Sequence, residues 1–368
     1  MLTIDQQIED IKKEIRKTPY HKGTERHIGI LKAKIARLKA KKEAAAIRGS
    51  SGRGISYAVK KQGDATVVLV GPPSAGKSTL LNALTNAESK VAPYAFTTVS
   101  VIPGMMKLRG AYIQILDVPG LIEGAEEGKG RGREVLSVAR GADLLVIISD
   151  ISRPQAIGRT LKALERNGIR VNKNPPEVKI EKKLKGGLIV KTNIKQEFDK
   201  ETAKDVASEM GIKNAEIQIR QKITLEELID VLAKNRVYIP AISVLNKADT
   251  INPQFTNDNN QSAIVNFQKD TLLISAETGR GLEKFKELVW EKLGLARIYL
   301  VKKNEEPGER NPIIVKEGGS LKELTDKLGE DFSESHNRAK IWGPGAKFPG
   351  QEVSLSAKIR HGMMVRFI

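Results

Sequence analysis

The sequence predicts an α/β fold, in which helices cover both faces of a mostly parallel sheet and smaller modules are attached. Two observations support this prediction. From Ala65 onward, apolar runs of strand length alternate with helical patterns, and this alternation is typical of parallel sheets. Beyond Arg297 the pattern changes to short apolar runs around one helix start. With 368 residues, the chain is too long for one ordinary core.

Residues 1–54 are predicted to form two amphipathic helices joined by a turn, followed by a hinge at 49–54. Isoleucine and leucine recur at helical spacing at positions 4, 8, 11 and 15, and again at 28, 31, 35 and 38. The turn between them contains Pro19 and Gly23. We expect this basic hairpin either to be a solvated charged surface or to contact phosphates, because its outer faces carry Lys12, Lys13, Arg16, Lys17, Lys32, Lys34, Arg37, Lys39, Lys41 and Lys42.

The strands of the central sheet are predicted at 65–70, 99–108, 111–116, 143–149, 241–245 and 271–275. A crossover helix over 154–167 accounts for only part of the long segment between the fourth and fifth strands. We therefore predict that residues 172–238 form an inserted α+β subdomain, basic in its early half. Within it, two short apolar runs around Gly186–Gly187 suggest a hairpin, and residues 225–232 suggest a helix.

The last part of the chain is predicted to be a small β-grasp module. Apolar runs at 298–302, 312–316 and 363–368 have strand length, and Ser320 with Glu323 forms a capping box that opens a helix. The predicted domains are therefore 1–54, 55–171, 172–238, 239–296 and 297–368.

A phosphate-binding loop follows the first predicted strand. Residues 71–78 read Gly-Pro-Pro-Ser-Ala-Gly-Lys-Ser, the strand–loop–helix pattern that surrounds nucleotide phosphates with backbone N–H groups. Lys77 adds a positive charge near the β- and γ-phosphates, and Ser78 offers a hydroxyl to Mg²⁺. The nucleotide contacts expected from this loop are Gly71, Ser74, Ala75, Gly76, Lys77, Ser78 and Thr79.

A second motif, Asp117-Val-Pro-Gly120, follows the third strand forty residues after Lys77. An Asp at this place can hold Mg²⁺ through water, and the Gly120 N–H can meet the γ-phosphate. A threonine between the two motifs is expected to complete the contacts to Mg²⁺ and the γ-phosphate. Thr98 is preferred over Thr97 for this role. We therefore expect Lys77, Thr98 and Gly120 to act in catalysis, and Ser78, Thr98 and Asp117 to hold the metal.

Two further motifs predict the choice of base. Asn246-Lys247-Ala248-Asp249 follows the fifth strand, and the two oxygens of Asp249 match the N1–H and N2–H₂ donors of guanine. Adenine lacks this donor pair, so the motif favours GTP over ATP and argues against an ATPase. The tripeptide Ser275-Ala276-Glu277 ends the next strand, where the Ala276 N–H is expected to reach guanine O6.

The composition restricts the partners and the compartment. The formal charge of +18 indicates a polyanionic partner, although a merely lysine-rich surface is the alternative. The chain has no cysteine, which excludes disulfides and thiolate chemistry. Because residues 1–7 have no signal-peptide core and no apolar run approaches ~18 residues, we expect a cytoplasmic protein that binds no membrane.

Taken together, these motifs resemble the Obg-like translation-factor GTPases. Within them, the chain is similar to the developmentally regulated GTP-binding (DRG) subfamily, through the Gly-rich segment 120–132, the turn 18–24, the insert and a C-terminal module like the TGS domain. The resemblance covers essentially the whole chain. It implies a Mg²⁺-dependent P-loop GTPase that contacts ribosomes or RNA through the basic hairpin, the insert and the TGS-like module, with a small accessory protein in some members.

The expected hydrolysis is slow in the isolated protein. Leu121 follows Gly120, where Ras-like enzymes keep a glutamine, and an aliphatic side chain cannot orient water. One hypothesis is a K⁺ ion beside the phosphate loop, although Ser74 stands where such enzymes usually carry Asn. Another is that Glu123, Arg131 or Arg133 completes the site on the ribosome.

Two functions remain open from the sequence. The first is a switch that hydrolyses GTP to GDP and phosphate on ribosomes, with segments 94–98 and 120–133 ordered by the γ-phosphate. The second is a GTP-sensing RNA-binding module with negligible turnover, in which Leu121 reflects lost catalysis. Phosphate release with and without ribosomes separates them.

Overall fold

The computed structural model describes residues 3–49, 62–85, 92–93, 100–118, 132–233, 235–250 and 271–368. The chain divides into two compact units, which are described separately. The first unit combines residues 1–56 with 165–238, and the second combines residues 57–164 with 239–368. The predicted hinge, apart from Gly49, lies outside the described residues.

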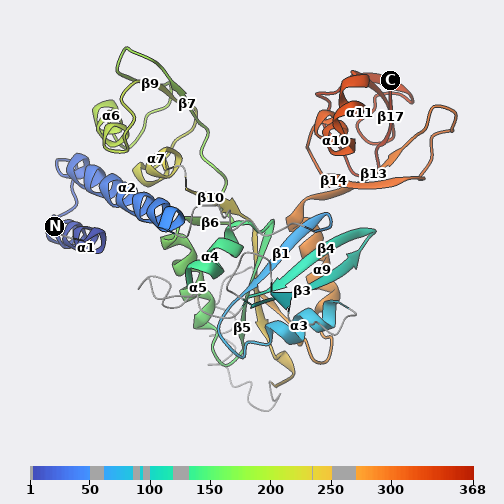
Figure 1. The fold of residues 1–368 in the computed structure, drawn as a ribbon, viewed down its shortest axis with the longest axis horizontal. Helices are drawn as coiled ribbons and strands as arrows, with labels where there is room; N and C mark the ends of the chain where they lie inside the picture. The colour runs from blue at the N-terminus through green and yellow to red at the C-terminus, as the bar shows by residue number, and fades with distance from the viewer. Residues whose placement is uncertain are drawn as a thin grey trace. The chain divides into compact units, whose positions relative to one another are not determined.

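The second unit contains a seven-stranded sheet with the order β12-β11-β5-β1-β4-β3-β2 (Figure 1). The strands β12, β11, β5, β1 and β4 run parallel, and β3 and β2 complete the sheet as antiparallel strands. This agrees with the predicted, mostly parallel sheet. The strands are β1 (Ala65–Val70), β2 (Ala92–Pro93), β3 (Ser100–Leu108), β4 (Ala111–Asp117), β5 (Leu144–Asp150), β11 (Ala241–Asn246) and β12 (Thr271–Leu273).

Helices pack on both faces of this sheet, which explains why every residue of β1 and β5 is buried. On one face, Leu80 and Leu81 of α3 and Phe285 of α9 are part of one hydrophobic core. Val67 and Leu69 of β1 belong to the same core. Two helices, α4 and α5, lie on the opposite face, and α4 contacts β1 there (Figure 1). The helices are α3 (Lys77–Leu84) and α9 (Leu282–Leu293) on the first face, with α4 (Gly132–Arg140) and α5 (Gln155–Arg166) opposite.

The C-terminal part of the second unit is a β-grasp module, as predicted. Its five-stranded sheet has the order β14-β13-β17-β15-β16. The strands that come first and last in the chain, β13 and β17, are parallel neighbours within it. Ser320 accepts a hydrogen bond from the Glu323 N–H and so forms the expected capping box. The elements are β13 (Leu295–Leu300), β14 (Pro312–Lys316), α10 (Leu321–Leu328), α11 (Glu330–Ser335), β15 (Arg338–Trp342), β16 (Gln351–Ser354) and β17 (Met364–Phe367).

The first unit contains the helical hairpin and the inserted α+β subdomain. The three-stranded sheet β7-β9-β8 lies within the inserted segment, and the two-stranded sheet β10-β6 pairs a strand just before the insert with one at its end. The elements are α1 (Ile4–Lys17), α2 (Glu25–Gly49), β6 (Ile169–Val171), β7 (Val178–Lys182), β8 (Leu188–Thr192), α6 (Lys200–Glu209), β9 (Ala215–Ile219), α7 (Leu225–Leu232) and β10 (Val237–Ile239).

The predicted hairpin around Gly186–Gly187 is wrong. The strands β7 and β8 do not pair with each other; β9 lies between them, antiparallel to β7 and parallel to β8. The reason is that β9 is fully apolar on its core face, with Ile217 and Ile219 buried against the helices. Between β7 and β8, strand β9 has a paired neighbour along each of its edges. A two-stranded hairpin of β7 and β8 would not provide this.

Helix α2 packs on the insert as well as on α1. Ala33 and Ala36 share a core with Val206 of α6 and Leu228 of α7. Gly29 permits the close approach, because a Cβ there would lie 2.6 Å from a methyl carbon of Leu225. The small residues of α2 therefore form a contact stripe, and larger residues there would overpack it at a cost of about 1–3 kcal/mol.

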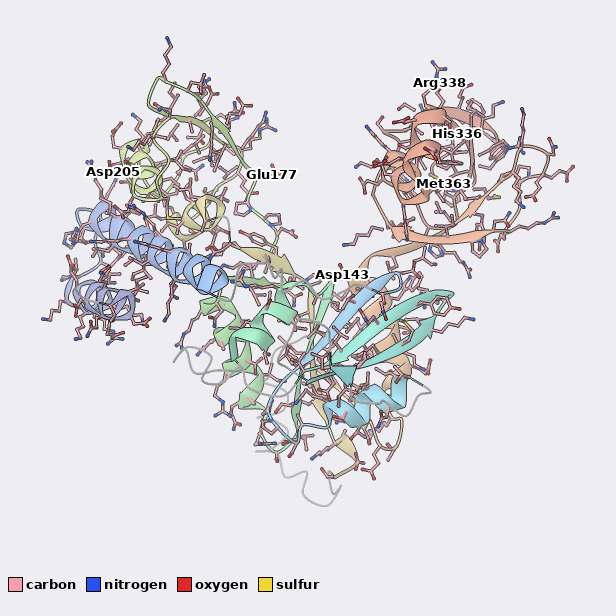
Figure 2. All side chains as sticks on the ribbon, in the orientation of Figure 1. Asp143, Glu177, Asp205, His336, Arg338 and Met363 are labelled. Atoms are coloured by element: carbon pink, nitrogen blue, oxygen red, sulfur yellow. The ribbon has the colours of Figure 1, made fainter. Side chains whose placement is uncertain are left out.

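This packing corrects the expectation that the basic residues of the second helix all lie on an outer face. Lys32 Nζ lies 2.6 Å from a Glu226 carboxylate oxygen, and Arg37 lies 3.4 Å from Glu209. On the same helix, Arg26 pairs with Asp205 of α6, labelled in Figure 2. Such partly exposed pairs contribute about 0–1 kcal/mol each, so they orient the hairpin on the insert more than they stabilise it.

Among the described helices, none is long and apolar enough to cross a membrane. The residue boundaries of the five predicted domains remain a prediction.

Candidate nucleotide-binding site

The predicted site residues follow the carboxyl ends of parallel strands. The phosphate loop follows β1, Asp117 ends β4, Asp150 ends β5 and Asn246 ends β11. Because these strands are parallel neighbours in the order β11-β5-β1-β4, their ends meet at one edge of the sheet. Ligands of open α/β sheets bind outside this edge.

The phosphate loop requires glycine at two positions. A Cβ at Gly71 would lie 1.9 Å from the Ile148 carbonyl oxygen, so the loop leaves β1 in direct contact with β5. Gly76 has φ +83° and immediately precedes α3, and a Cβ there would lie 2.2 Å from Asn246 Nδ2. Ser74 also has a positive φ of 60°. Positive φ angles at these two positions help to turn the N–H groups of the loop toward one point and form an anion-binding concavity.

Lys77 is buried, and its ammonium group donates to two carbonyls of its own loop. Nζ lies 3.0 Å from the Pro72 oxygen and 3.3 Å from the Gly71 oxygen. Burial lowers the pKa of Lys77, whereas the charge of Asp117 opposes this shift. The loop thus holds a desolvated cation beside the concavity.

Ser78 and Asp117 meet in the same place. Ser78 Oγ donates to Asp117 Oδ2 at 2.5 Å, while Asp117 Oδ1 is buried and accepts no hydrogen bond from the described residues. Burial raises the pKa of Asp117, and the Ser78 hydrogen bond and the Lys77 charge oppose this. An unpartnered carboxylate oxygen beside a hydroxyl fits Mg²⁺, which prefers oxygen ligands and takes few from the protein.

Asn246 connects the phosphate loop to the segment after β12. Its Nδ2 donates to the Ala75 oxygen at 3.0 Å, and its Oδ1 accepts from the Ala276 N–H at 2.9 Å. The Ala276 N–H thus donates to Asn246 in this structure, and its contact with guanine O6 stays a prediction. All three residues are buried, so these hydrogen bonds are shielded from water.

Asp249 lies in the short 3₁₀ helix η2 (Ala248–Thr250) and is exposed. A hydrogen bond from the fully buried Ser275 and the charge of Lys247 lower the pKa of Asp249, so its carboxylate is ionised at neutral pH. The Ala248 N–H donates to the Ile274 oxygen at 3.0 Å and holds this turn against the end of β12. Glu277 is exposed.

Sequence reasoning missed one residue of the site, Arg153. Its guanidinium contacts the Pro73 carbonyl of the phosphate loop at 3.0 Å and the Asp150 carboxylate at 2.5 Å. Burial alone would raise the pKa of Asp150, but hydrogen bonds from Arg153 and Ser152 lower it overall. The sequence feature that could have predicted Arg153 is an aspartate at the carboxyl end of a buried strand, Asp150, three residues before it.

A cavity of about 330 Å³ opens over this arrangement and is lined by Ser74, Gly76, Lys77, Ser78, Thr79 and Lys247. The structure therefore brings the phosphate loop, Asp117 and the Asn246–Asp249 segment to one edge. Thr98 and Gly120 lie outside the described residues, as do Thr97, Leu121, Glu123 and Arg131. Within the described ranges there is no cluster of three or more histidine or acidic residues that would hold a metal by itself.

The fold and the site define a P-loop GTPase. Residues 66–183 match the family described as a 50S ribosome-binding GTPase, and residues 185–295 match the C-terminal region of that domain.

Full-length relatives then identify the subfamily. An uncharacterized GTP-binding protein of Methanocaldococcus jannaschii is 44% identical over 369 residues, which cover 100% of this chain and 93% of the relative. The developmentally-regulated G-protein 3 of Arabidopsis thaliana is 38% identical, covering 100% and 99%. The human developmentally-regulated GTP-binding protein 2 is 35% identical, covering 99% and 98%. The chain belongs to the DRG subfamily of the Obg-like GTPases.

Proposed function

We propose that this protein is a Mg²⁺-dependent molecular switch that hydrolyses GTP to GDP and phosphate while acting on ribosomes or RNA in the cytoplasm. The observation that supports this most directly is the Asn246 bridge. Its hydrogen bonds connect the loop that faces the phosphates to the segment after β12, and Asn246 itself stands three residues before Asp249. One rigid link thereby couples recognition of guanine to the position of the phosphates.

The residues of the described site have distinct proposed roles. Backbone N–H groups of residues 74–79 hold the phosphates, and Lys77 moves its ammonium from the loop carbonyls to the β- and γ-oxygens. Ser78 and Asp117 would hold Mg²⁺, which supplies neutralisation of phosphate charge when bound. Asp249 accepts the two guanine donors, and Lys247 lines the same cavity. Thr98 and Gly120 complete the γ-phosphate contacts in this proposal.

The step from GTP to GDP lacks a glutamine that could orient water, because Leu121 stands at that position. We propose that the isolated protein is consequently slow. Two devices would restore the rate: K⁺ near Ser74, or Glu123, Arg131 or Arg133 placed by the ribosome. Equal turnover in K⁺ and Na⁺ buffers would eliminate the first device. Alanine variants with unchanged ribosome stimulation would eliminate the second.

The proposed RNA contact rests on charge. The net charge is +18, and part of the hairpin's basic surface is not neutralised: Lys17, Lys22 and Lys34 form no ion pair with described residues. Cations of this kind contact phosphates and release counterions. Binding should therefore weaken steeply with salt, whereas salt-insensitive binding would contradict the proposal. A small accessory protein remains part of the proposal, through resemblance alone.

The experiment that tests the proposal is phosphate release from GTP in K⁺ buffer, with and without ribosomes. A slow basal rate that ribosomes raise several-fold supports the switch. A fast basal rate contradicts it. Tight GTP binding with no release under either condition favours the alternative, a GTP-sensing RNA-binding module. Leu121 supports this alternative, because an aliphatic side chain cannot orient the attacking water.

A further inference from the structure

The tip of the β3–β4 hairpin contacts the β-grasp module through one tryptophan ring. The hairpin turns at Arg109 and Gly110, which have positive φ angles of 51° and 88°. The guanidinium carbon of Arg109 lies 5.4 Å from the centroid of the Trp290 ring on α9. His361 of the β-grasp module packs edge-on against the same ring, with 6.3 Å between the centroids. Because Trp290 is buried, it forms a fixed contact between the hairpin tip and the module.

A second contact joins the hairpin to the module close to the first. Asp64 pairs with Tyr112 of β4, since its N–H donates to the Tyr112 oxygen at 2.7 Å and its carboxylate accepts from the Tyr112 N–H at 2.9 Å. The other carboxylate oxygen of Asp64 lies 3.5 Å from Lys327 Nζ of α10. Lys327 also donates to the Ile314 carbonyl of β14 at 2.9 Å, so its ammonium group is held within the module. Asp64 thus connects β4 to a helix of the module.

The opposite end of the same hairpin belongs to the nucleotide site. Strand β4 begins at Ala111 beside the tip and ends at Asp117. Seven consecutive residue pairs join it to β3, the last of them Ile102 opposite Asp117. Asp117 carries the buried oxygen that accepts no hydrogen bond from the described residues and fits Mg²⁺. A packed ladder does not deform continuously, so a displacement at Asp117 reaches the tip.

Building on the GTP switch proposed above, we propose that the β3–β4 hairpin couples the nucleotide at Asp117 to the seat of the β-grasp module. Asp64 and Arg109 are the positioning residues of this coupling. Mg²⁺ bridges the β- and γ-phosphates of GTP, whereas GDP offers it no γ-phosphate, so Asp117 is held differently in the two states. The contacts at the tip are then stronger in one state than in the other.

Such a coupling is reciprocal. If the nucleotide changes the strength of the contacts with the module, the contacts must change the preference of the site for GTP over GDP by the same factor. The module therefore sets the nucleotide preference of a site that it does not touch, and both directions can be measured.

The first measurement uses Trp290 as a reporter at the contact. The chain has two tryptophans, and the other, Trp342, contacts Arg366 within the module. Full-length Trp342→Phe therefore leaves the emission of Trp290 alone. Its spectrum should differ between Mg²⁺ with GDP and Mg²⁺ with a nonhydrolysable GTP analogue, because a guanidinium and an imidazole lie against the ring. Arg109→Ala in this background should remove the difference. Identical spectra with the two nucleotides before that change would overturn the proposal.

The second measurement is the ratio of the Kd values for GDP and for the GTP analogue. The double variant Arg109→Ala with Lys327→Ala should change this ratio by about fivefold, the lower end of typical couplings. Arg109→Lys should restore part of the change, since an ammonium group also binds over an indole ring. The matched control is Lys322→Ala, an exposed lysine of the same helix as Lys327, which should leave the ratio unchanged. Urea unfolding would verify that each variant is folded.

The results also separate this proposal from the switch on which it rests. If the double variant weakens both nucleotides by the same factor, the contacts are only structural and the coupling is wrong. If the wild-type protein hydrolyses GTP but the double variant keeps the wild-type ratio, the coupling is again wrong and the switch stands. If the wild-type protein releases no phosphate from GTP with or without ribosomes, the switch itself fails.

Discussion

Replacing Asn246 tests the coupling between the base and phosphate sides of the site. In Asn246→Ala, the buried Ala75 oxygen and Ala276 N–H each lose their partner from this side chain. Asn246→Asp keeps the acceptor for Ala276 but loses the donor, and it places a carboxylate oxygen against the Ala75 carbonyl. We therefore expect both variants to be impaired, with the Asp variant no better than the Ala variant.

The magnitude follows from the burial of the two groups. Asn246 is 2% exposed, Ala75 0% and Ala276 5%, so water cannot replace the lost partners without local opening. A buried polar group left without a partner costs about 1–3 kcal/mol, and two such groups cost about 2–6 kcal/mol. This loss is shared between the free energy of unfolding and the free energy of nucleotide binding.

Two measurements on each variant capture the whole loss: urea unfolding of the nucleotide-free protein and the Kd for a fluorescent GDP analogue. The sum of the two changes should be at least about 2 kcal/mol. The control is Thr278→Ala, an exposed residue of the neighbouring loop, which should change either quantity by no more than about 0.5 kcal/mol. An Asn246→Ala protein with wild-type stability and GDP affinity would refute the coupling.

Three further predictions follow. Ser78→Ala removes the hydroxyl beside Asp117, so the ratio of GDP affinities with Mg²⁺ and with EDTA should fall toward one; an unchanged ratio would contradict the metal site. Arg153→Ala releases the Pro73 carbonyl and should raise Kd for GDP and GTP alike by about five- to tenfold, whereas an effect on GTP alone would contradict a role in positioning the loop. Hydrogen bonds from two lysines and Gln218 lower the pKa of Glu216 from 4.5 to about 2. The stabilisation is therefore present above pH 4.5 and is lost as pH falls toward 2, so the urea midpoint of Glu216→Gln should depend less on pH in this window; parallel curves would contradict it.

The central sheet was predictable because its strands are buried on both faces. A strand such as β5, Leu144–Asp150, is a continuous apolar run, and the helical patterns between such runs specify parallel neighbours. The phosphate loop was predictable for a similar reason. Its glycines stand where the backbone approaches β5 and Asn246 too closely for any side chain.

The insert was harder to predict because its short strands do not reveal their partners. Residues 178–182 and 188–192 flank a glycine pair, which favours a hairpin locally, but the apolar strand β9 is more deeply buried between them. The packing of α2 was also hidden, since Ala33 and Ala36 contribute little to an apolar stripe. Arg153 was missed because its partners are a carbonyl eighty residues earlier in the chain and a carboxylate outside every recognised motif.

Calorimetric titration of the purified protein with GDP and with ADP, both with Mg²⁺, tests the central claim most directly. The two oxygens of Asp249 match the paired N–H donors of guanine, which adenine lacks, so GDP should bind at least about 10³-fold more tightly than ADP. Asp249→Ala should remove most of this difference. Similar affinities for the two nucleotides would contradict the assignment of this site to GTP.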